Sequence, residues 1–359
     1  MDAVPPAPAP HMGGTGLSRG PLSVVYLLED TTLFGGVKIV LHQAELMARR
    51  GHDVTVVSKG ERPGWFPLRA GFLQVTALEP RHFPTADVTV ATFWTTIKAA
   101  AAVTSGTAVH YCQGFEGGFR HNRDDHAAIT EAYQLPIPCL ALSPHLAVLV
   151  KERFGRPARV VPPALVSYWR PAWRWRPHRI PRVLVANPFE IEWKGVATAL
   201  ATVSMLRSQG FSCRLVRLSQ WPLSTAERAL LEPDEFHHHL EPSRVAELLR
   251  GADLMLAPSW EGEGFGLPVL EAMASGLPVV ASDISAFRAF AGTAAVLVSP
   301  DRPEAFAEAA RTILGDPARW RTMRRRGLEA ARGFTEERVA EIAEGALYWV
   351  AEGRWRSEP

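Results

Sequence analysis

The sequence predicts an α/β protein of two domains, each built around a doubly wound parallel sheet. Short apolar runs alternate with amphipathic stretches along the chain, which is typical of such a sheet. The chain has 359 residues, more than one hydrophobic core usually supports, so two domains are expected. A segment at residues 162–182 interrupts the alternation, and the pattern restarts after it.

The first half begins with an apolar run at residues 24–28, long enough for a buried parallel strand. A turn at Gly35 and Gly36 leads into an amphipathic helix over residues 37–50, and Gly51 occupies the usual C-cap position. Further strands are expected at residues 54–57, 88–91, 108–111, 139–142 and 159–161.

The second half repeats the alternation of strand and helix. Strands are expected at residues 183–186, 214–218, 236–240, 254–258, 278–282 and 295–298. Helices are expected between them at residues 196–208 and 243–250, and three further helical patterns close the chain at residues 303–314, 317–332 and 336–349.

These patterns divide the chain into five parts. Residues 1–20 are rich in Pro, Gly and Ala and predict a disordered tail. An N-terminal domain (21–163), a linker (164–182) and a C-terminal domain (183–335) follow, and a helix in residues 336–359 is expected to pack back on the N-terminal domain.

Bulk properties narrow the class of protein. The formal charge is only +2, which gives no reason to expect a nucleic-acid partner. The three cysteines, Cys112, Cys139 and Cys213, lack the spacing of a metal site or a disulfide framework and favour a reducing compartment. No run of about 18 uncharged apolar residues occurs, so a cytoplasmic protein is expected.

The most informative stretch is residues 259–282, which places Glu263 and Glu271 eight positions apart. A strand is expected just before it, and a Gly-rich turn and a helix lie within it. Ligands of parallel α/β sheets bind at the carboxyl ends of strands, where helix N-termini present amides to anions. Two carboxylates beside such amides suit a charged ligand rich in hydroxyl groups, and a nucleotide sugar is one.

Together with this stretch, three others carry a family resemblance: residues 34–38 with 50–57, residues 142–146 through 161–163, and residues 193–195. The sequence resembles the family 4 retaining glycosyltransferases (glycosyl transferases group 1), over about residues 21–350. The resemblance implies the GT-B fold, in which two Rossmann-like domains face each other across a cleft. It also implies a nucleoside-diphosphate sugar as co-substrate, a hydroxyl acceptor, retention of anomeric configuration, and neither a cofactor nor a metal ion.

The resemblance assigns roles to the two glutamates. Glu271 would accept hydrogen bonds from both ribose hydroxyls, a good arrangement for a carboxylate and a vicinal diol. Glu263 would lie near the transferred sugar, where a carboxylate stabilises positive charge developing at the anomeric carbon. An ordinary acid at a helix N-terminus and a solvated loop acid are the alternatives. Glu261 is outside the eight-residue spacing and is not expected to take part.

The donor diphosphate would be held by backbone and by one lysine. Gly264, Phe265, Gly266 and Leu267 form the turn into the helix, whose amides could bind the diphosphate. Lys194 matches the family's lysine for the leaving group, and a solvated lysine at a helix start is the alternative. Asn187 stands where the family usually has a basic residue, so one phosphate-binding cation is missing.

In the N-terminal domain, Gly35 and Gly36 would bring a helix start against the donor phosphates or the acceptor. Their neighbour Lys38 is expected to face solvent. His110, at a strand end, would contact the donor sugar, although a structural histidine is an equal alternative. Gln113 and Glu116 in the following loop would serve the acceptor, and the sequence around them bears a weak likeness to bacterial surface-polysaccharide transferases.

Two other motifs suggest different chemistry. His237, His238 and His239 lie on one expected strand, where neighbours face opposite sides, so they should not bind one metal ion. The linker has five arginines, four Trp or Tyr residues and no acid. It could contact an anionic membrane at the inner face or a polyanionic acceptor, or pack its aromatic rings between the domains.

The sequence thus predicts a retaining, metal-independent hexosyl- or deoxyhexosyltransferase that acts on a saccharide of a bacterial surface polysaccharide or glycoconjugate. A nucleotide-sugar epimerase is less consistent with the Glu263/Glu271 pair. A catalytically silent GT-B protein that scaffolds an active transferase is the alternative outside enzymology, and the missing cation at Asn187 favours it. The sequence does not define the donor base and sugar, the acceptor, the linkage or the oligomeric state.

Overall fold

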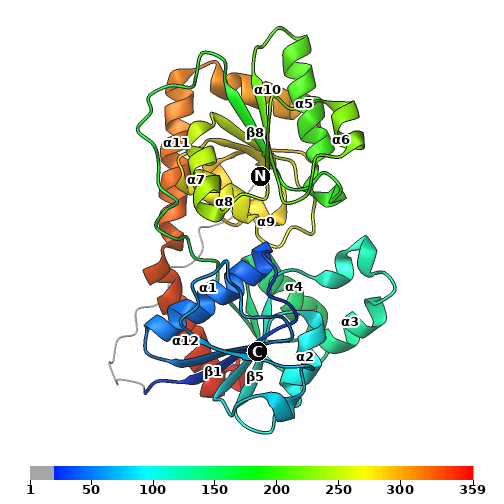
Figure 1. The fold of residues 1–359 in the computed structure, drawn as a ribbon, viewed down its shortest axis with the longest axis vertical. Helices are drawn as coiled ribbons and strands as arrows, with labels where there is room; N and C mark the ends of the chain where they lie inside the picture. Colours follow the sequence, from blue (N-terminus) through cyan, green and yellow to red (C-terminus); the bar gives the residue numbers. More distant parts are fainter. Residues whose placement is uncertain (1–19, 359) are drawn as a thin grey trace.

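The computed structural model describes residues 20–358, which form two α/β domains stacked along the long axis of the molecule (Figure 1). The predicted disordered tail lies outside the described residues, except for Gly20. Each domain contains one sheet, and every strand pair in both sheets is parallel. The prediction of two doubly wound domains is confirmed.

The N-terminal sheet has seven strands in the order β3-β2-β1-β4-β5-β6-β7. Their bounds are β1 Ser23–Leu28, β2 Asp53–Ser58, β3 Gly71–Gln74, β4 Val88–Ala91, β5 Thr107–Cys112, β6 Cys139–Ala141 and β7 Ala158–Val160. The central strands are almost fully buried, which explains their apolar sequences. The edge strand β3 is short and mostly exposed, so it lacks the apolar run by which the other strands were predicted.

The C-terminal sheet has six strands in the order β10-β9-β8-β11-β12-β13. Their bounds are β8 Arg182–Ala186, β9 Arg214–Ser219, β10 Glu235–His238, β11 Leu254–Ala257, β12 Val279–Ser282 and β13 Val296–Val298. In both sheets the strand order reverses beside the first strand of the domain, between β1 and β4 and between β8 and β11. Such switch points open a crevice at the carboxyl ends of the strands.

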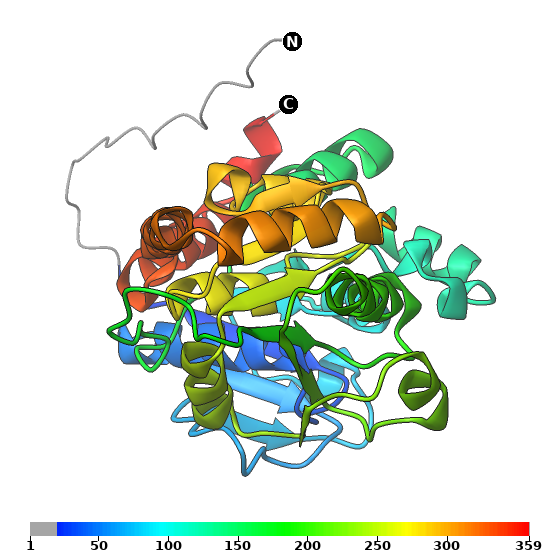
Figure 2. The same ribbon diagram turned by 90° about the horizontal axis from the view of Figure 1, so that it is seen from above.

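Helices cover both faces of each sheet (Figures 1 and 2). The N-terminal domain contains α1 Gly35–Arg49, α2 Trp94–Ala101, α3 His126–Tyr133 and α4 Pro144–Phe154. The C-terminal domain contains α5 Val196–Ser208, α6 Thr225–Leu230, α7 Pro242–Gly251, α8 Leu267–Ala274, α9 Ser285–Arg288, α10 Pro303–Leu314 and α11 Pro317–Ala331.

The last long helix, α12 Glu336–Ala351, lies against α1 of the N-terminal domain (Figure 1). Glu336 at its start pairs with His42 at 2.6 Å and with Arg49 at 3.1 Å. About two turns further along α12, Glu344 pairs with Arg50 at 2.5 Å and with His52 at 3.0 Å. The chain therefore crosses between the domains twice, once through the linker and once before α12.

The linker has a buried part and an exposed part. Trp169 is buried, whereas Trp173 and Trp175 are 85% and 62% exposed. The exposed pair makes an edge-on contact at 5.1 Å between ring centroids. Arg174 turns inward and pairs with the fully buried Asp253 just before β11.

Candidate active site in the interdomain cleft

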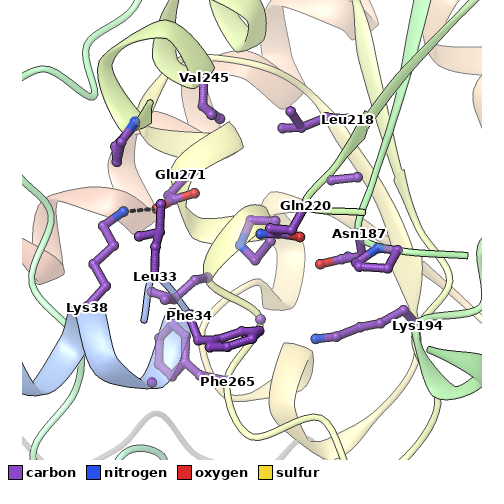
Figure 3. A pocket seen from close by; sticks show the side chains of 18 of the residues that line it. Leu33, Phe34, Lys38, Asn187, Lys194, Leu218, Gln220, Val245, Phe265 and Glu271 are labelled. Carbon is purple, nitrogen blue, oxygen red and sulfur yellow. Dashed lines mark hydrogen bonds and ion pairs between the residues drawn. The ribbon is translucent and has the colours of Figure 1, made fainter. Parts of the chain in front are cut away.

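A cavity of about 370 Å³ lies between the two domains, at the carboxyl ends of their strands (Figure 3). Its walls combine residues that follow β5, β6, β8 and β9 with the starts of α1 and α8. The N-terminal domain and linker contribute Leu33, Phe34, Gly35, Gly36, Lys38, Ile39, Gln113, Leu142 and Trp169. The C-terminal domain contributes both predicted glutamates, Lys194 and the whole Gly264–Leu267 turn.

The turn before α8 depends on glycine at Gly266, which has φ 90° and serves as the N-cap. A Cβ at this position would also lie 2.2 Å from the ring of Phe287. Phe265 beside it is buried and stacks on Phe290 at 4.7 Å. This packing fixes the turn, and it leaves the N-terminus of α8 at the cavity wall, where its free amides can bind an anion.

Glu263 and Lys194 meet inside the cavity. Lys194 Nζ donates to Glu263 Oε2 at 2.7 Å, and the two side chains are only 17% and 10% exposed. Lys194 ends the short turn before α5, and a ring stack holds that turn: Trp193 lies 4.9 Å from Phe119 and 5.6 Å from His121. The N-terminal domain thus supports the loop that presents Lys194.

Glu271 pairs with a lysine from the opposite domain. Lys38 Nζ in α1 donates to Glu271 Oε1 in α8 at 2.8 Å (Figure 3). Burial alone would lower the pKa of Lys38, but Glu271 and Tyr168 outweigh it and raise the pKa above its usual value. The expectation that Lys38 faces solvent is therefore wrong, because its partner lies in the other domain and 233 residues away in the sequence.

The glycines bring the domains into close contact. A Cβ on Gly264 would lie 1.9 Å from the carbonyl oxygen of Gln113, so only glycine fits at this point. Ser143 Oγ donates to the carbonyl oxygen of Gly264 at 3.0 Å, and Gly36 packs against the Gln113 side chain. Gly35 lies beside Leu267 of α8.

The two predicted acceptor residues have different positions. Gln113 lines the cavity, and its buried Oε1 has no hydrogen-bond partner among the described residues. Glu116 does not line the cavity, because its loop turns it into the N-terminal domain. There it accepts a hydrogen bond from Tyr133 at 2.5 Å, and burial raises its pKa to about 7. The structure therefore gives no support to an acceptor role for Glu116.

His110 also lies outside the cavity, contrary to the prediction. It is fully buried within β5, two residues before the end of the strand, and packs edge-on against Tyr133 at 5.0 Å. Neither ring nitrogen has a hydrogen-bond partner within residues 20–358, and burial and the nearby Arg156 hold the pKa of His110 well below its usual value. The residue type and the nearby strand end were visible in the sequence, but the depth of burial was not.

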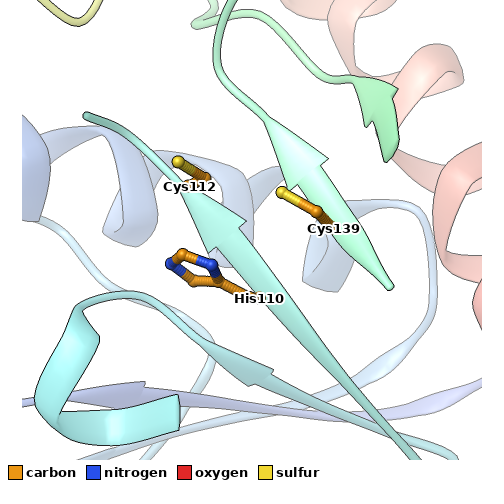
Figure 4. A group of neighbouring side chains, drawn as sticks. All are labelled: His110, Cys112 and Cys139. Carbon is orange, nitrogen blue, oxygen red and sulfur yellow. The ribbon is translucent and has the colours of Figure 1, made fainter. Parts of the chain in front are cut away.

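His110, Cys112 and Cys139 form the group of described residues whose geometry resembles a metal site (Figure 4). Their ligand atoms lie within 4.8 Å of one another, since β5 and β6 are adjacent and His110 pairs with Cys139. However, the guanidinium of Arg156 acts on both His110 and Cys139, and this fixed positive charge opposes a divalent cation.

Asn187, in place of the expected basic residue, lines the cavity with its backbone at φ 82°. Arg217, which contacts Asn187, is fully buried, does not line the cavity and does not replace the missing cation. Its guanidinium pairs with Glu227 at 2.5 Å and donates to the carbonyl oxygens of Val185 and Asn187. Among the described residues that line the cavity, the lysines and arginines are therefore only Lys38 and Lys194.

The far end of the cavity was not predicted. It is formed by loops after β9 and β10 together with α7, through Leu218, Gln220, Trp221, His239, Leu240, Val245 and Leu249. These residues give a mostly apolar wall with a few polar groups. Only their position after expected strands could have indicated them.

No helix within residues 20–358 has the length and apolar character needed to cross a bilayer.

Comparison with known proteins identifies relatives over part of the chain. A family model described as Glycosyl transferases group 1 matches residues 180–316. D-inositol 3-phosphate glycosyltransferase of Nocardia farcinica is 31% identical over 188 residues, 51% of this chain and 40% of the relative. The GDP-mannose-dependent alpha-(1-6)-phosphatidylinositol dimannoside mannosyltransferase of Mycobacterium tuberculosis is 36% identical over 149 residues, 40% of this chain. The matched parts thus span less than half the length of these relatives.

Solved structures match nearly the whole chain at low sequence identity. Sucrose-phosphate synthase from Thermosynechococcus elongatus has a TM-score of 0.74 and 17% identity, with 94% of this chain and 100% of that chain covered. WaaG, a glycosyltransferase involved in lipopolysaccharide biosynthesis, has a TM-score of 0.67 and 16% identity over 91% of this chain and 99% of its own. Anabaena HepE in complex with UDP-glucose has a TM-score of 0.70 and 14% identity over the same shares. These likenesses confirm the GT-B fold.

Proposed function

We propose that this protein transfers a sugar from a nucleoside-diphosphate sugar to a hydroxyl acceptor, and the match of residues 180–316 to the glycosyl transferases group 1 model supports the proposal. One observation carries the proposal. Glu263 and Glu271 line the same interdomain cavity, each beside a lysine, with the N-terminus of α8 between them in the sequence.

The cavity provides a group for each part of the donor. Glu271 accepts from the ribose hydroxyls, and the amides at the start of α8 bind the diphosphate together with Lys194. Since these groups neutralise the leaving diphosphate, transfer is expected to need no metal ion and to continue in the presence of a chelator. Glu263 lies beside Lys194, where the transferred sugar would join the diphosphate.

Transfer would retain the anomeric configuration. The bond between the anomeric carbon and the phosphate oxygen breaks, and the acceptor oxygen forms its bond on the same face of the sugar. The acceptor proton passes to the departing phosphate oxygen, so that the products are a glycoside and a nucleoside diphosphate. The Glu263 carboxylate stabilises the positive charge that develops at the anomeric carbon.

The acceptor would enter from the N-terminal side of the cleft. Gln113 is the polar group there, and its unpartnered Oε1 can accept from an acceptor hydroxyl. The names of the curated relatives indicate polyol and glycolipid acceptors. We therefore assign this protein a saccharide or polyol acceptor in the synthesis of a bacterial surface polysaccharide or glycoconjugate. Contacts between the domains at Gly264 would exclude water, which otherwise hydrolyses an activated sugar.

The exposed part of the linker suits peripheral contact with a membrane. Trp173 and Trp175 project from a segment that contains arginines and no acid. Indole rings favour the headgroup region, and arginines favour anionic lipids. Sedimentation with vesicles of phosphatidylglycerol and phosphatidylcholine tests this. Binding should require the anionic lipid and should fall in a Trp173→Ala/Trp175→Ala variant, and equal binding of this variant would contradict the proposal.

A direct assay tests the proposed reaction. The protein is incubated with single nucleotide sugars and a mixture of saccharide and polyol acceptors, and release of nucleoside diphosphate is followed. Release should depend on one donor, and the product should keep the donor's anomeric configuration by NMR. If no donor is bound or consumed, the scaffold alternative, which the missing cation at Asn187 favours, replaces the proposed reaction.

A further inference from the structure

We infer that Lys38 is a positioning residue for the donor, and that through Glu271 it makes the site select ribonucleotides over 2′-deoxyribonucleotides. The inference rests on the proposed function, in which Glu271 receives the ribose. To the proposed donor site it adds Lys38 from the opposite domain. It also specifies the donor further, since the ribose of its nucleotide must carry a 2′-hydroxyl.

The ion pair joins the two domains at the cavity wall. Lys38 belongs to α1 and Glu271 to α8, and their side chains are only 19% and 12% exposed. The Lys38 ammonium donates a hydrogen bond to Oε1 of the Glu271 carboxylate, whereas Oε2 accepts no hydrogen bond from the part of the chain described here. Glu271 is thus held in one orientation with an oxygen still free for a ligand.

The linker restrains Lys38 in turn. Its ammonium lies 5.1 Å from the centre of the Trp169 ring, a cation–π distance, and the nearby Tyr168 side chain helps to raise the pKa of Lys38. No other lysine or arginine among the described cavity residues can take its place, since Lys194 is paired with Glu263. The position of the ammonium beside Glu271 is therefore well defined.

A ribose diol can lie against this ion pair, beside the free Oε2 of Glu271. Each hydroxyl can donate to the carboxylate and, at the same time, accept from the ammonium. Removing the 2′-hydroxyl leaves a charged group without one of its partners, at a place where both side chains are largely buried. Sites built to hydrogen-bond a hydroxyl reject analogues that lack it. Loss of one such bond to a charged group should weaken binding about 10- to 100-fold.

Lys38 could instead only stabilise the contact between the domains. In that case its loss would weaken all nucleotides by the same factor. If it acts through Glu271, its loss reduces binding of the ribonucleotide more than binding of the deoxyribonucleotide. The ratio of the two dissociation constants separates these roles, and a general loss of stability does not change it.

The test is calorimetric titration with UDP against 2′-deoxy-UDP and GDP against 2′-deoxy-GDP. Wild type should bind one of the two ribonucleotides about 10- to 100-fold more tightly than the corresponding 2′-deoxyribonucleotide. Lys38→Met should bring this ratio close to one, and Lys38→Arg should restore much of it. Lys59→Met is the matched control, because Lys59 is also paired with a glutamate, Glu29, but lies outside the cavity.

Each outcome decides the matter. An unchanged ratio in Lys38→Met, or a wild type without preference, would overturn the role of Lys38 while leaving the proposed function in place. If wild type binds none of these four nucleotides, and ADP, dTDP and CMP do not bind either, the proposed function fails and this inference fails with it. A thermal unfolding scan of each variant confirms that the binding data refer to folded protein.

Discussion

Lys194 Nζ lies 2.7 Å from Glu263 Oε2 within the cavity between the two domains. The lysine precedes α5 and the glutamate precedes α8, so the two turns that follow β8 and β11 meet at this pair. In the proposed reaction the cation faces the leaving diphosphate and the carboxylate faces the anomeric carbon. Lys194 thus faces the negative charge that develops on the leaving diphosphate, and Glu263 faces the positive charge that develops at the anomeric carbon.

Replacing Glu263 by Gln should lower kcat about 10²- to 10³-fold, because the amide keeps a hydrogen-bond acceptor but loses the negative charge. Nucleotide binding should remain close to that of wild type. Glu261→Gln is the control, since Glu261 bonds to Ser285 and does not line the cavity. Equal kcat for wild type and Glu263→Gln would contradict the assigned role.

Replacing Lys194 by Met should weaken nucleoside-diphosphate binding about 10- to 100-fold, the usual value of a charged hydrogen bond. The corresponding nucleoside, which has no phosphate, should bind as it does to wild type. Calorimetric titration of both ligands measures the difference. A loss of the same size for both ligands would show that Lys194 acts on the fold and not on the diphosphate.

Replacing Gly264 by Ala should lower both Tm and turnover. The new methyl group would lie 1.9 Å from the carbonyl oxygen of Gln113, so the turn or the domain contact must move. Gly345→Ala in α12 is the control, since a Cβ there meets nothing within 4 Å and alanine favours a helix by about 0.5–1 kcal/mol. Similar behaviour of the two variants would argue against a tight domain contact at Gly264.

Because the Glu116 carboxyl is buried, the unfolding free energy should depend on pH in a specific way. Burial raises the pKa of this carboxyl to about 7 in the folded protein, so the folded state favours the protonated carboxyl. Its stabilising contribution is complete below pH 4.5 and is lost as the pH rises through 7. Relative to Glu116→Gln, wild type should lose about 3 kcal/mol of unfolding free energy over this range. Denaturant titrations of both proteins at pH 5 and pH 8 measure this loss. The same change in unfolding free energy with pH in both proteins would contradict a buried Glu116 carboxyl.

Replacing His110 by Phe should leave kcat unchanged. The ring lies outside the cavity, and its two nitrogens have no hydrogen-bond partners in the described part of the chain, so an apolar ring of similar size suits the site. Stability should stay the same or rise, because an unpartnered buried polar group is removed. A large fall in kcat with an intact fold would return His110 to the active site.

The sequence predicted most of the fold because buried parallel strands such as residues 183–186 are continuous apolar runs. It missed β3, which lies at a sheet edge and is largely exposed. It also placed no helices at α2, α3 and α4, where no apolar periodicity was recognised. The Glu263/Glu271 spacing located the cavity, since both residues belong to one continuous turn and helix.

Contacts between distant segments were beyond prediction. Lys38 was expected in solvent because nothing in its neighbourhood reveals that α8 comes within 2.8 Å of it. His110 and Glu116 were correctly predicted as polar residues near a strand end. Whether their side chains point into the cavity or into the domain core depends on how β5 and the following loop pack. Spacing along the chain fixes which residues are neighbours within an element, not which element they face.

The most direct measurement is thermal unfolding of the protein with UDP, GDP, dTDP, ADP and CMP, for wild type and for Glu271→Ala. A ligand at about 100 times its dissociation constant adds about 2.7 kcal/mol to the native state, a shift of several degrees. We predict that one nucleoside diphosphate raises the Tm of wild type and that Glu271→Ala abolishes the shift. An unchanged Tm with every nucleotide, or the same shift in both proteins, would contradict a donor site built on Glu271.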